Sequence, residues 1–332
     1  MDRRGFMMLA GGLAAQLALS SHRVLAESAP ASAPSLPNPF LQEGRWFKAA
    51  FHAHTTTSDG NVDVPTRLAQ YRERGYQVVA ITDHWKTNDL SQYAEENFLP
   101  IVGMEFHPRT GTGAPSHHFV ALNLPHPFEL DRNLPAQQMV DAVLATGAVV
   151  IYAHPYWTAH SIPEMLEVTG YSGVEVFNAG CELECGRGHS SVHWDQLLNK
   201  GRIVGGLATD DVHGEIELNR GWTMIKAPSL DVASIMKAVR EGSYYASAGP
   251  EILDCRIEEG VIRVTTGPVR EIKFVVDGAG GGHVARAKPG ETITSAEWTF
   301  GTSRRKYRWI RVEVIDEQDN HAWTNPLLLP PA

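Results

Sequence analysis

The sequence predicts an α/β domain followed by a smaller domain made of β-strands. From about residue 46 to residue 242, short apolar runs alternate with amphipathic segments of helical period, a pattern typical of a largely parallel sheet. Six or seven such units favour a closed or nearly closed barrel, with functional residues at the carboxyl ends of the strands. From residue 250 onward the runs alternate with period two between Gly- and Asp-containing turns, which predicts a small antiparallel β-sandwich.

Residues 1–26 are expected to be an export signal rather than part of the fold. Arg3 and Arg4 form a basic start, and an apolar stretch covers residues 6–19. The paired arginines resemble a twin-arginine signal, which carries folded proteins to the periplasm. A membrane anchor is the alternative, but the stretch contains Gln16 and is shorter than the roughly 20 residues that a span requires. We therefore expect a periplasmic protein with no membrane span after the signal is removed.

The rest of the chain divides into three expected parts. Residues 27–44 are rich in Ala, Ser and Pro and are expected to be a linker. The α/β domain is expected at residues 45–249 and the β-domain at residues 250–332. Strands of the first are expected at residues 46–52, 77–82, 99–105, 118–122, 148–153, 173–177 and 202–208. Its helices are expected at residues 64–75, 135–147, 190–200 and 230–241, and strands of the β-domain at residues 252–257, 261–265, 271–276 and 306–315.

The composition is that of a soluble globular protein, with 43% hydrophobic and 20% charged residues. The net charge of −9 argues against a nucleic acid or an anionic membrane as the main partner. It does not argue against an anionic small substrate, because bound metal ions reverse the local field. Cys181 and Cys185 could pair in an oxidising compartment or stay reduced, and the spacing leaves both open. Nothing in the sequence indicates an oligomeric state.

The first sign of a metal site is the segment A-F-H-A-H-T-T-T-S-D-G at residues 50–60. His52 and His54 end an apolar run, and residues two apart on a strand point to the same face. Asp59 follows in a turn-rich segment five residues later. Two imidazoles on one face and a carboxylate beside them suit a metal ion better than a hydrophobic core.

The same pattern returns at the ends of the later strands. A lone His or Asp at a strand end is usually a cap or a solvated loop residue, but here such residues recur along the whole domain. Carboxylates crowded together repel and are costly to bury, so the cluster requires cations. Imidazole and carboxylate ligands without cysteine suit Zn, Mn or Fe(II). The recurring residues are His84, Glu105, His118, His154, Asp211 and His213.

The ordered motifs resemble those of the PHP superfamily of polymerase-associated and histidinol-phosphatase-like metallohydrolases. They are H-x-H with S-D-G, T-D-H at residues 82–84, G-x-E at 103–105, H-P at 154–155 and D-x-H at 211–213. Further segments are similar to the carbaryl-hydrolase-like branch, which carries a C-terminal β-domain. These are E-V-F-N at residues 175–178, W-D with L-L at 194–198, residues 241–250 and W-T-N-P at 323–326.

The resemblance implies a distorted seven-stranded PHP-type barrel that holds two to three divalent ions of Zn, Mn or Fe. A first ion would be held by His52, His54, Glu105 and Asp211. Glu105 would bridge to a second ion, completed by His118 and His154. A third would be held by Asp59, His84 and His213. His117 competes with His118, whose spacing is preferred, and Asp83 is expected to support a ligand rather than to be one.

The expected function is a metal-dependent hydrolase, with a phosphoesterase favoured. A metal-bridging water would lose its proton near neutral pH and attack a small phosphomonoester or phosphodiester. Glu105, Asp211 and His213 are the expected catalytic residues. Substrate-binding candidates near the barrel mouth are Arg187, Lys86, His189 and Arg220, with His193 also considered.

Two other functions stay open. A carbamate, carboxyl ester or amide hydrolase would use Trp85, Tyr156 and Trp157 to shape an apolar pocket, although these residues could equally be packing residues. A non-catalytic periplasmic binding protein would use its β-domain to recognise a glycan or another protein. The complete set of expected metal ligands argues against the second alternative.

Overall fold

The computed structural model describes residues 36–108, 116–278, 281–300 and 306–330. The expected signal at residues 1–26 therefore lies outside the described residues. Within the segment expected to be a linker, Pro39–Leu41 form a 3-10 turn capped by Asn38, and Phe40 packs against Trp46 and Tyr245. No helix of the described ranges is long and apolar enough to cross a membrane.

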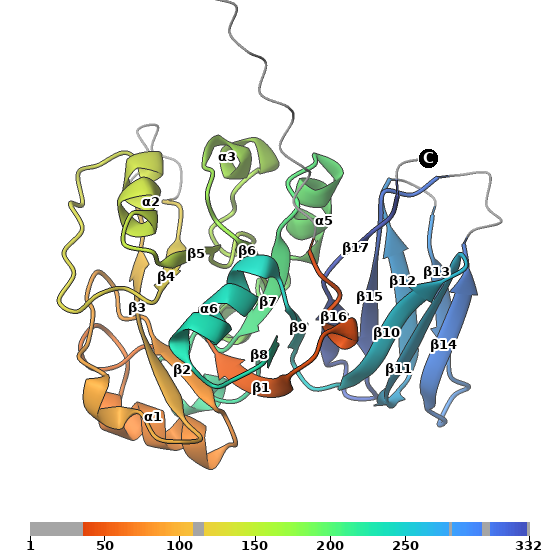
Figure 1. The fold of residues 1–332 in the computed structure, drawn as a ribbon, viewed down its shortest axis with the longest axis horizontal. Helices are drawn as coiled ribbons and strands as arrows, with labels where there is room; N and C mark the ends of the chain where they lie inside the picture. The colour runs from red at the N-terminus through yellow and green to blue at the C-terminus, as the bar shows by residue number, and fades with distance from the viewer. Residues whose placement is uncertain (1–35, 109–115, 279–280, 301–305, 331–332) are drawn as a thin grey trace, which may run out of the picture. The chain divides into compact units, whose positions relative to one another are not determined.

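Strands and helices alternate through the first two thirds of the chain, as the sequence predicts (Figure 1). The strands are β1 (Arg45–Ala50), β2 (Val78–Ile81), β3 (Leu99–Phe106), β4 (Phe119–Leu122), β5 (Val149–Tyr152), β6 (Gly173–Asn178), β7 (Gly205–Thr209), β8 (Trp222–Ala227) and β9 (Tyr244–Ser247). The helices are α1 (Val64–Glu73), α2 (Ala136–Leu144), α3 (Ile162–Glu167), α4 (Ala179–Cys185), α5 (Ser191–Asn199) and α6 (Val232–Glu241), with 3-10 turns η2 (Ser91–Tyr93) and η3 (Glu215–Glu217). The seven expected strands and four expected helices are confirmed; α3, α4, β8 and β9 were not predicted.

The C-terminal part consists of strands. They are β10 (Ile252–Glu258), β11 (Val261–Val269), β12 (Glu271–Val276), β13 (His283–Arg286), β14 (Ile293–Thr299), β15 (Trp309–Ile315), β16 (His321–Thr324) and β17 (Leu327–Leu328). All their pairings are antiparallel. β10, β11 and β14 form a three-stranded sheet, and the others continue the large sheet through the β16–β9 pair.

The large sheet is mixed rather than largely parallel, which corrects the sequence prediction. β1, β2 and β3 pair in parallel, as do β5, β6 and β7, but β4 is antiparallel to both of its neighbours. β8 is antiparallel to β1. A strand buried on both faces has the same apolar sequence whether it is parallel or antiparallel to its neighbours, because the two arrangements differ only in their hydrogen-bond pattern. Strand direction therefore could not be read from the hydrophobic pattern.

The sheet curls around a core of its own side chains. Phe47 of β1, Val120 of β4 and Ile225 of β8 belong to one buried cluster, which Met236 of α6 also joins. β7 lies against β8 and β9 without a ladder of hydrogen bonds between them. The arrangement brings the ends of β1, β3, β5 and β7 toward one another.

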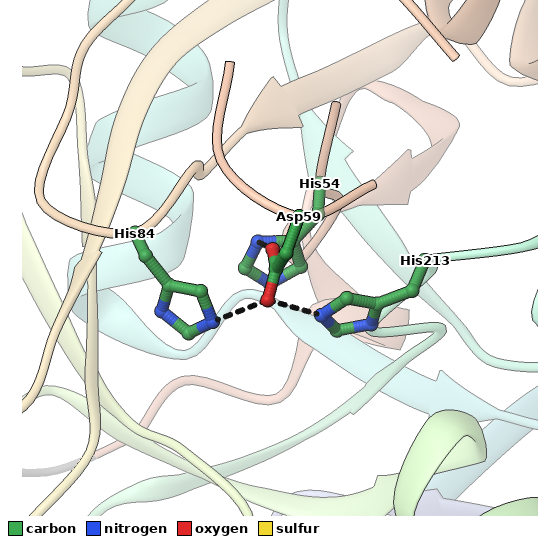
Figure 2. Close-up of side chains that lie close together, drawn as sticks. All are labelled: His54, Asp59, His84 and His213. Carbon is green, nitrogen blue, oxygen red and sulfur yellow. Dashed lines mark ion pairs between the residues drawn. The ribbon is translucent and has the colours of Figure 1, made fainter. Parts of the chain in front are cut away.

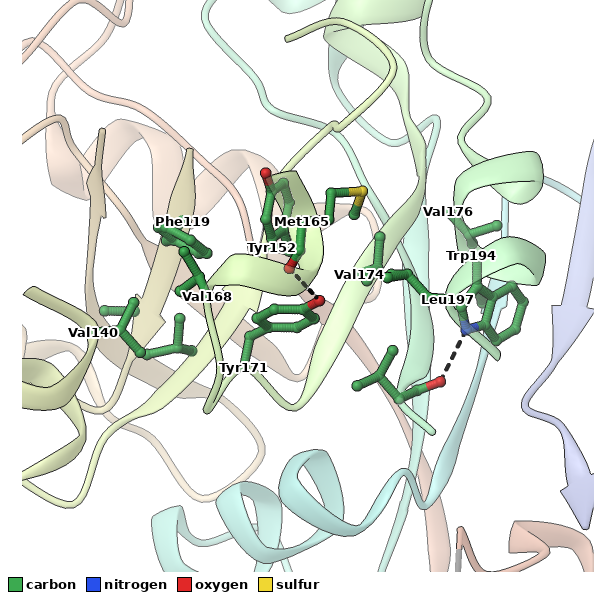
Figure 3. Packing of buried hydrophobic residues seen from close by; sticks show 14 of the residues in the cluster. Phe119, Val140, Tyr152, Met165, Val168, Tyr171, Val174, Val176, Trp194 and Leu197 are labelled. Atoms are coloured by element: carbon green, nitrogen blue, oxygen red, sulfur yellow. Dashed lines mark hydrogen bonds between the residues drawn. The ribbon is translucent and has the colours of Figure 1, made fainter. Parts of the chain in front are cut away.

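A second cluster fills the space between the strands and the covering helices (Figure 3). α2 packs on β5 and α5 packs on β6. Trp194 of α5 is fully buried, and its indole N–H donates a hydrogen bond of 2.9 Å to the carbonyl of Val204. Tyr171 likewise donates to the carbonyl of Met165 over 3.0 Å. These polar tips are satisfied, so the large rings add apolar burial without leaving an unpaired donor.

Helix boundaries follow local capping chemistry. Asp63 accepts a hydrogen bond from the backbone of Thr66 at the start of α1, and Asp231 does the same for Ser234 at the start of α6. α6 ends at Gly242, whose φ of 75° is a left-handed conformation that glycine adopts without strain. The side chain of Asn178 caps α4, which places the start of that helix beside the ends of β6 and β7.

Candidate metal centre

The two histidines after β1 enter the same buried space. His52 and His54 have no exposed surface, and their ring centroids lie 5.1 Å apart. The backbone N–H of His54 donates to the carbonyl of Val212 over 3.0 Å, so the segment after β1 runs beside the segment after β7. The Nε2 atoms of both histidines lie 3.1 to 3.2 Å from Oδ1 of Asp211.

Glu105, at the end of β3, is the carboxylate on which these histidines converge. Its Oε1 lies 2.7 Å from Nδ1 of His118 and 3.3 Å from Nε2 of His154. Its Oε2 lies 3.2 Å from Nε2 of His52 and 3.1 Å from Nδ1 of His84. The two oxygens thus face different imidazoles, which is the geometry required of a carboxylate that bridges two cations.

A third group lies at the edge of the site, where Asp59 stands between two histidines (Figure 2). Oδ2 of Asp59 lies 3.3 Å from Nε2 of His84 and 3.5 Å from Nε2 of His213, and Oδ1 lies 3.5 Å from Nδ1 of His54. The Asp59 side chain is half exposed, whereas Glu105 is buried. This group is therefore the most accessible to solvent.

Two ligand candidates have unusual backbone conformations. His154 has a φ of 24° and Asp211 a φ of 51°, both in the left-handed region that residues other than glycine rarely adopt. The surrounding contacts hold them there. The N–H of His154 donates to Glu175, the N–H of Asp211 donates to the carbonyl of His52, and the Asp211 carboxylate accepts from Asn178.

Glu175 and Asn178, both on β6, are supporting residues that the site prediction missed. Oε1 of Glu175 lies 2.7 Å from Nδ1 of His52, and Oε2 accepts from Nδ2 of Asn178 over 2.8 Å. The same Asn178 nitrogen lies 3.0 Å from Oδ2 of Asp211. One short chain of contacts therefore orients His52 and Asp211 together. The sequence did contain a sign of this role: Glu175 lies on a fully buried strand, and a carboxylate buried there requires a partner.

The carboxylates and imidazoles shift one another's ionisation. Burial alone lowers the pKa of His54, but its contacts with Asp211 and Glu105 raise that pKa to about 9. Burial alone raises the pKa of Glu105, whereas His52, His118 and His154 together hold it well below its ordinary value. Glu105 and Asp211 are thus ionised at neutral pH, and they raise the pKa values of His52, His54 and His154.

The donor set fits metal ions. Three overlapping groups have ligand atoms within 4.8 Å of one another: His52, His54, Glu105 and Asp211; Glu105, His118 and His154; and His54, Asp59, His84 and His213. Within the described residues, His54 Nε2, His84 Nδ1 and Asp211 Oδ1 are buried and face other ligand atoms at 3.1 to 3.2 Å, but none of them makes a hydrogen bond of acceptable geometry. A cation between such atoms would satisfy them. All nine residues named as metal ligands from the sequence lie in these groups.

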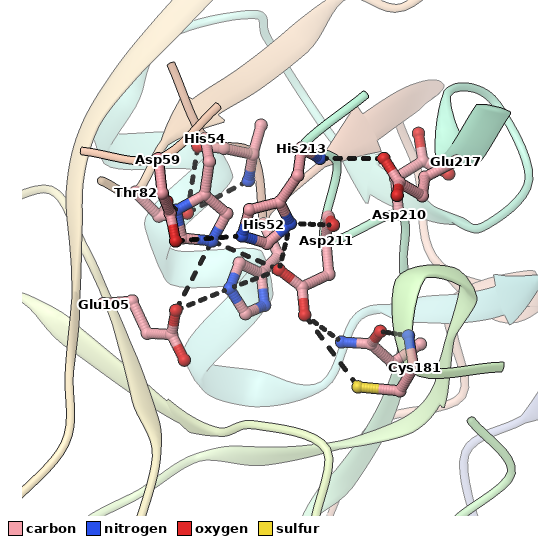
Figure 4. A network of polar contacts seen from close by, with 12 residues as sticks. His52, His54, Asp59, Thr82, Glu105, Cys181, Asp210, Asp211, His213 and Glu217 are labelled. Carbon is pink, nitrogen blue, oxygen red and sulfur yellow. Dashed lines mark hydrogen bonds and ion pairs between the residues drawn. The ribbon is translucent and has the colours of Figure 1, made fainter. Parts of the chain in front are cut away.

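The site opens into a first cavity of about 350 Å³. It is lined by residues of the three ligand groups together with Trp157, Cys181, Glu184 and Glu217. None of these four was named as a site residue from the sequence, and Trp157 was considered only as an aromatic wall. In Figure 4, Cys181 lies beside Asp211, with Sγ 4.0 Å from Oδ2. Cys181 and Cys185 are free, so they do not form a disulfide.

The expected substrate-binding residues lie elsewhere. Lys86 is exposed and donates to the carbonyl of Thr57, and the guanidinium of Arg187 lies over the ring of Tyr156. Neither lines the first cavity. His189 and Arg220 line a second cavity of about 420 Å³. His193 lies beside Tyr156, with ring centroids 6.0 Å apart.

The structure also places Asp83, which was expected to support a ligand, and His117, which competed with His118 as a ligand. Asp83 accepts hydrogen bonds from the backbone and hydroxyl of Thr55 and from the hydroxyl of Ser58, so it holds the loop that carries Asp59. His117 contacts the hydroxyl of Tyr152 over 2.7 Å rather than Glu105, and burial followed by the nearby His160 lowers its pKa to about 4.

Comparisons with known proteins support the fold. No family model matches the sequence, and no curated protein matches it. A solved two-domain protein from Bacteroides vulgatus, which contains a predicted PHP-like metal-dependent phosphoesterase, is 16% identical. That match covers 90% of this chain and 100% of that chain, at a TM-score of 0.52. The chain therefore has the mixed α/β fold, with a large sheet and few helices, of this two-domain PHP-like protein.

Two other solved structures match smaller parts. An amidohydrolase from Chromobacterium violaceum is 15% identical and the match covers 50% of this chain and 88% of that chain, at a TM-score of 0.39. A lesion-specific endonuclease from Pyrococcus furiosus is 11% identical, with 59% and 56% covered and a TM-score of 0.40. TM-scores this low do not establish a shared fold.

Proposed function

We propose that this chain is a metal-dependent phosphoesterase of the PHP superfamily that cleaves a small phosphomonoester or phosphodiester. The observation that carries the proposal is the shared position of Glu105 and His54 between overlapping ligand groups. Ligands shared in this way hold cations close enough to act on one phosphate group. Zn, Mn and Fe(II) are the ions that suit imidazole and carboxylate ligands.

The charge of the site favours a phosphate substrate more with three bound cations than with two. The ligand groups contain three carboxylates, and Glu175 adds a fourth negative charge beside His52. Glu184 and Glu217 also line the first cavity, so three divalent cations balance six carboxylates, whereas two leave the site negative. A phosphate dianion is therefore bound more readily by the first arrangement than by the second. Metal stoichiometry therefore bears directly on the substrate class.

The residues of the chain have separate tasks in this proposal. Bound divalent cations would supply a water nucleophile at neutral pH and offset charge on the phosphate oxygens. Glu105 and Asp211 would hold those cations in fixed positions from β3 and β7. His213 has its Nδ1 2.9 Å from the carbonyl of Asp211, which leaves Nε2 directed toward Asp59 at the accessible edge of the site.

The finer assignments belong to the same proposal. We place the chain in the carbaryl-hydrolase-like branch, with a seven-stranded barrel at residues 45–249 and a sandwich at residues 250–332. The buried cluster to which β1, β2, β3, β4, β5 and β7 contribute supports the barrel. The cluster shared by Ile262 of β11 and Val312 of β15 supports the sandwich. The paired Arg3 and Arg4 support export to the periplasm.

Hydrolysis of an aryl carbamate or carboxyl ester is the second candidate, and one observation favours it. Of the three aromatic residues considered from the sequence, Trp157 lines the first cavity, with its ring 5.7 Å from that of His118. Trp85 instead donates its indole N–H to His107, and Tyr156 is exposed. An aromatic wall beside the ligands suits a neutral aryl leaving group as well as an aryl phosphate.

Paired turnover assays separate the two candidates. Metal-loaded protein is assayed with p-nitrophenyl phosphate, bis-p-nitrophenyl phosphate and 1-naphthyl N-methylcarbamate, beside a Glu105→Ala variant. We expect hydrolysis of a phosphate ester that is lost in the variant. A clear preference for the carbamate would overturn the phosphoesterase proposal. A full metal complement without hydrolysis of any ester would instead favour a binding protein.

A further inference from the structure

The second cavity lies across helix α4 from the candidate metal centre. Alternate faces of this helix line the two cavities: Gly180, Cys181 and Glu184 line the first, whereas Ala179, Glu182 and Leu183 line the second. The opposite wall of the second cavity is formed by the segment before β8 and by the turn between β15 and β16. Its volume of about 420 Å³ is in the range of small-molecule sites.

Flat rings make up much of the wall. The ring centroids of Phe177 and His189 lie 4.9 Å apart, and those of His189 and His321 lie 5.1 Å apart. Trp222 adds an indole from β8. Burial, and then the neighbouring His321, lower the pKa of His189, so its imidazole is neutral at neutral pH. Rings at several angles are suited to packing against a flat unsaturated ring.

The charged groups on the cavity wall are the guanidinium of Arg220 and the carboxylates of Glu182 and Asp319. The carboxylate of Glu182 accepts the backbone N–H of Gly188 over 2.9 Å, and Asp319 forms an ion pair with Arg270. The guanidinium of Arg220 has no carboxylate partner among the described residues, and within it only Nε is bonded, to the carbonyl of Ile216 over 2.6 Å. The terminal nitrogens of this guanidinium therefore remain available to an oxyanion.

We propose that the second cavity is a binding site for a flat ring that carries an anionic group, such as a nucleoside monophosphate or an aryl phosphate. The ring packs among His189, Trp222 and Phe177, and the anion pairs with Arg220. Such a ligand is either a separate molecule or the part of a phosphodiester substrate that lies away from the cleaved bond. The proposal concerns binding and does not depend on hydrolysis at the metal centre.

Binding of adenosine monophosphate (AMP) to the chelator-treated full chain, measured by calorimetry, tests the site. We expect one AMP per chain, and about tenfold weaker binding in Arg220→Ala because a charge-assisted hydrogen bond is lost. Lys237→Ala is the matched control, because Lys237 is an exposed cation on α6 that lines neither cavity. Glu105→Ala is expected to bind AMP as the unaltered chain does.

Partial ligands and a second variant separate the contribution of the ring from that of the anion. Adenosine lacks the anion and inorganic phosphate lacks the ring, so each should bind more weakly than AMP. His189→Ala should weaken AMP and leave inorganic phosphate unchanged. The proposal fails if AMP does not bind, or if its affinity is retained in Arg220→Ala and lost in Glu105→Ala.

Kinetics of the metal-loaded protein distinguish the two sources of the ligand. If the ring belongs to the substrate, Arg220→Ala raises KM for a nucleoside p-nitrophenyl phosphodiester several-fold more than for p-nitrophenyl phosphate. If the ligand is a separate molecule, AMP changes the rate with p-nitrophenyl phosphate without competing for the metal centre. Absence of all hydrolysis would contradict the proposed function but would leave the calorimetric result standing.

Discussion

Glu105 is the residue whose surroundings say most about the site. It is a buried carboxylate with imidazoles against both oxygens, and no other residue belongs both to the innermost ligand group and to the group completed by His118 and His154. His84, by contrast, is one of the residues at the accessible edge. The two positions therefore differ in how many ligand groups depend on them.

We expect Glu105→Ala to lose more metal than His84→Ala. Elemental analysis of the unaltered chain should give about two to three equivalents, because the nine expected ligands fall into three overlapping groups. Removal of Glu105 takes a ligand from two groups, whereas removal of His84 takes one from the outer group. One equivalent or none, unchanged in both variants, would show that the cluster is not a metal centre.

Glu175→Gln is expected to weaken metal binding about 10- to 100-fold, the usual effect of losing a residue that orients a ligand. The Glu175 carboxylate faces Nδ1 of His52, so in the metal-bound protein it would accept Nδ1–H and leave Nε2, on the side of Glu105 and Asp211, for a cation. A Gln side chain directs its amide N–H groups at Nδ1, and the proton moves to Nε2, where it blocks a cation.

Metal titration by calorimetry measures this effect, and Glu164→Gln serves as the control. Glu164 caps α3 through Ser161 and contacts none of the ligand groups. Equal metal affinity in the two variants would mean that Glu175 does not orient His52. Partial recovery in Glu175→Asp, which keeps the negative charge, would strengthen the assignment.

At the scale of elements, the segment between β1 and α1 folds back so that the backbone of Gly60 packs closely against that of His54. Gly60 lies so near the backbone of His54 that an added Cβ would stand 2.5 Å from its carbonyl carbon and oxygen. Asp83 also holds this segment, by accepting a hydrogen bond from the hydroxyl of Ser58. The position of Asp59 beside His84 therefore depends on the absence of a side chain at residue 60.

We expect Gly60→Ala to destabilise the fold by about 1 to 3 kcal/mol, the usual cost of overpacking. It should also lower the occupancy of the outer metal group, because the backbone of His54 must move. Urea denaturation and elemental analysis measure the two effects. Gly267→Ala is the control, because its nearest neighbour is 4.0 Å away. Equal stability of the two variants would contradict the expectation.

At the scale of the whole molecule, Arg311 joins the helical part of the chain to the C-terminal strands. Its buried guanidinium on β15 forms hydrogen bonds of 2.7 and 2.8 Å with the carboxylate of Asp195 on α5 and one of 3.1 Å with Glu313. It also lies over the ring of Trp194. A buried charge of this kind is tolerated only while its partners remain ionised.

The partner Glu313 makes stability depend on pH. Burial raises its pKa, but the hydrogen bond from His321 and the charge of Arg311 outweigh burial and hold that pKa well below its ordinary value. A depressed carboxyl pKa contributes stability that is fully present above the unfolded-state pKa of about 4.3 and is lost as the pH falls through the folded-state pKa.

Glu313→Gln should therefore cost about 3 kcal/mol at pH 7, the lower end for breaking a buried pair, and progressively less below about pH 4. Urea denaturation across that pH range measures the difference. Glu297→Gln is the control, because Glu297 pairs with Arg263 on an exposed strand face and such pairs contribute little. A difference for Glu313→Gln that does not change with pH would show that its charge is not the source.

Much of the site was visible in the order of residues along the chain. An apolar run that ends in His, Asp or Glu places that side chain at a strand end, and the strand ends converge when the strands share a sheet. The seven expected strands formed, and His52, Glu105, His154 and Asp211 lie together as the motif order indicated. These features depend on local pattern, which the sequence carries directly.

Other features depend on contacts between distant segments. The antiparallel direction of β4, the contact of Glu175 with His52 and the helix α4 that separates His189 and Arg220 from the metal ligands were not predicted. Hydrophobic period records which face of an element is buried, but not which partner covers it or how strongly the sheet curls. The sequence by itself thus determined the elements and the ligand types. Only long-range packing decided which ligands share Glu105, what supports them and where the second cavity lies.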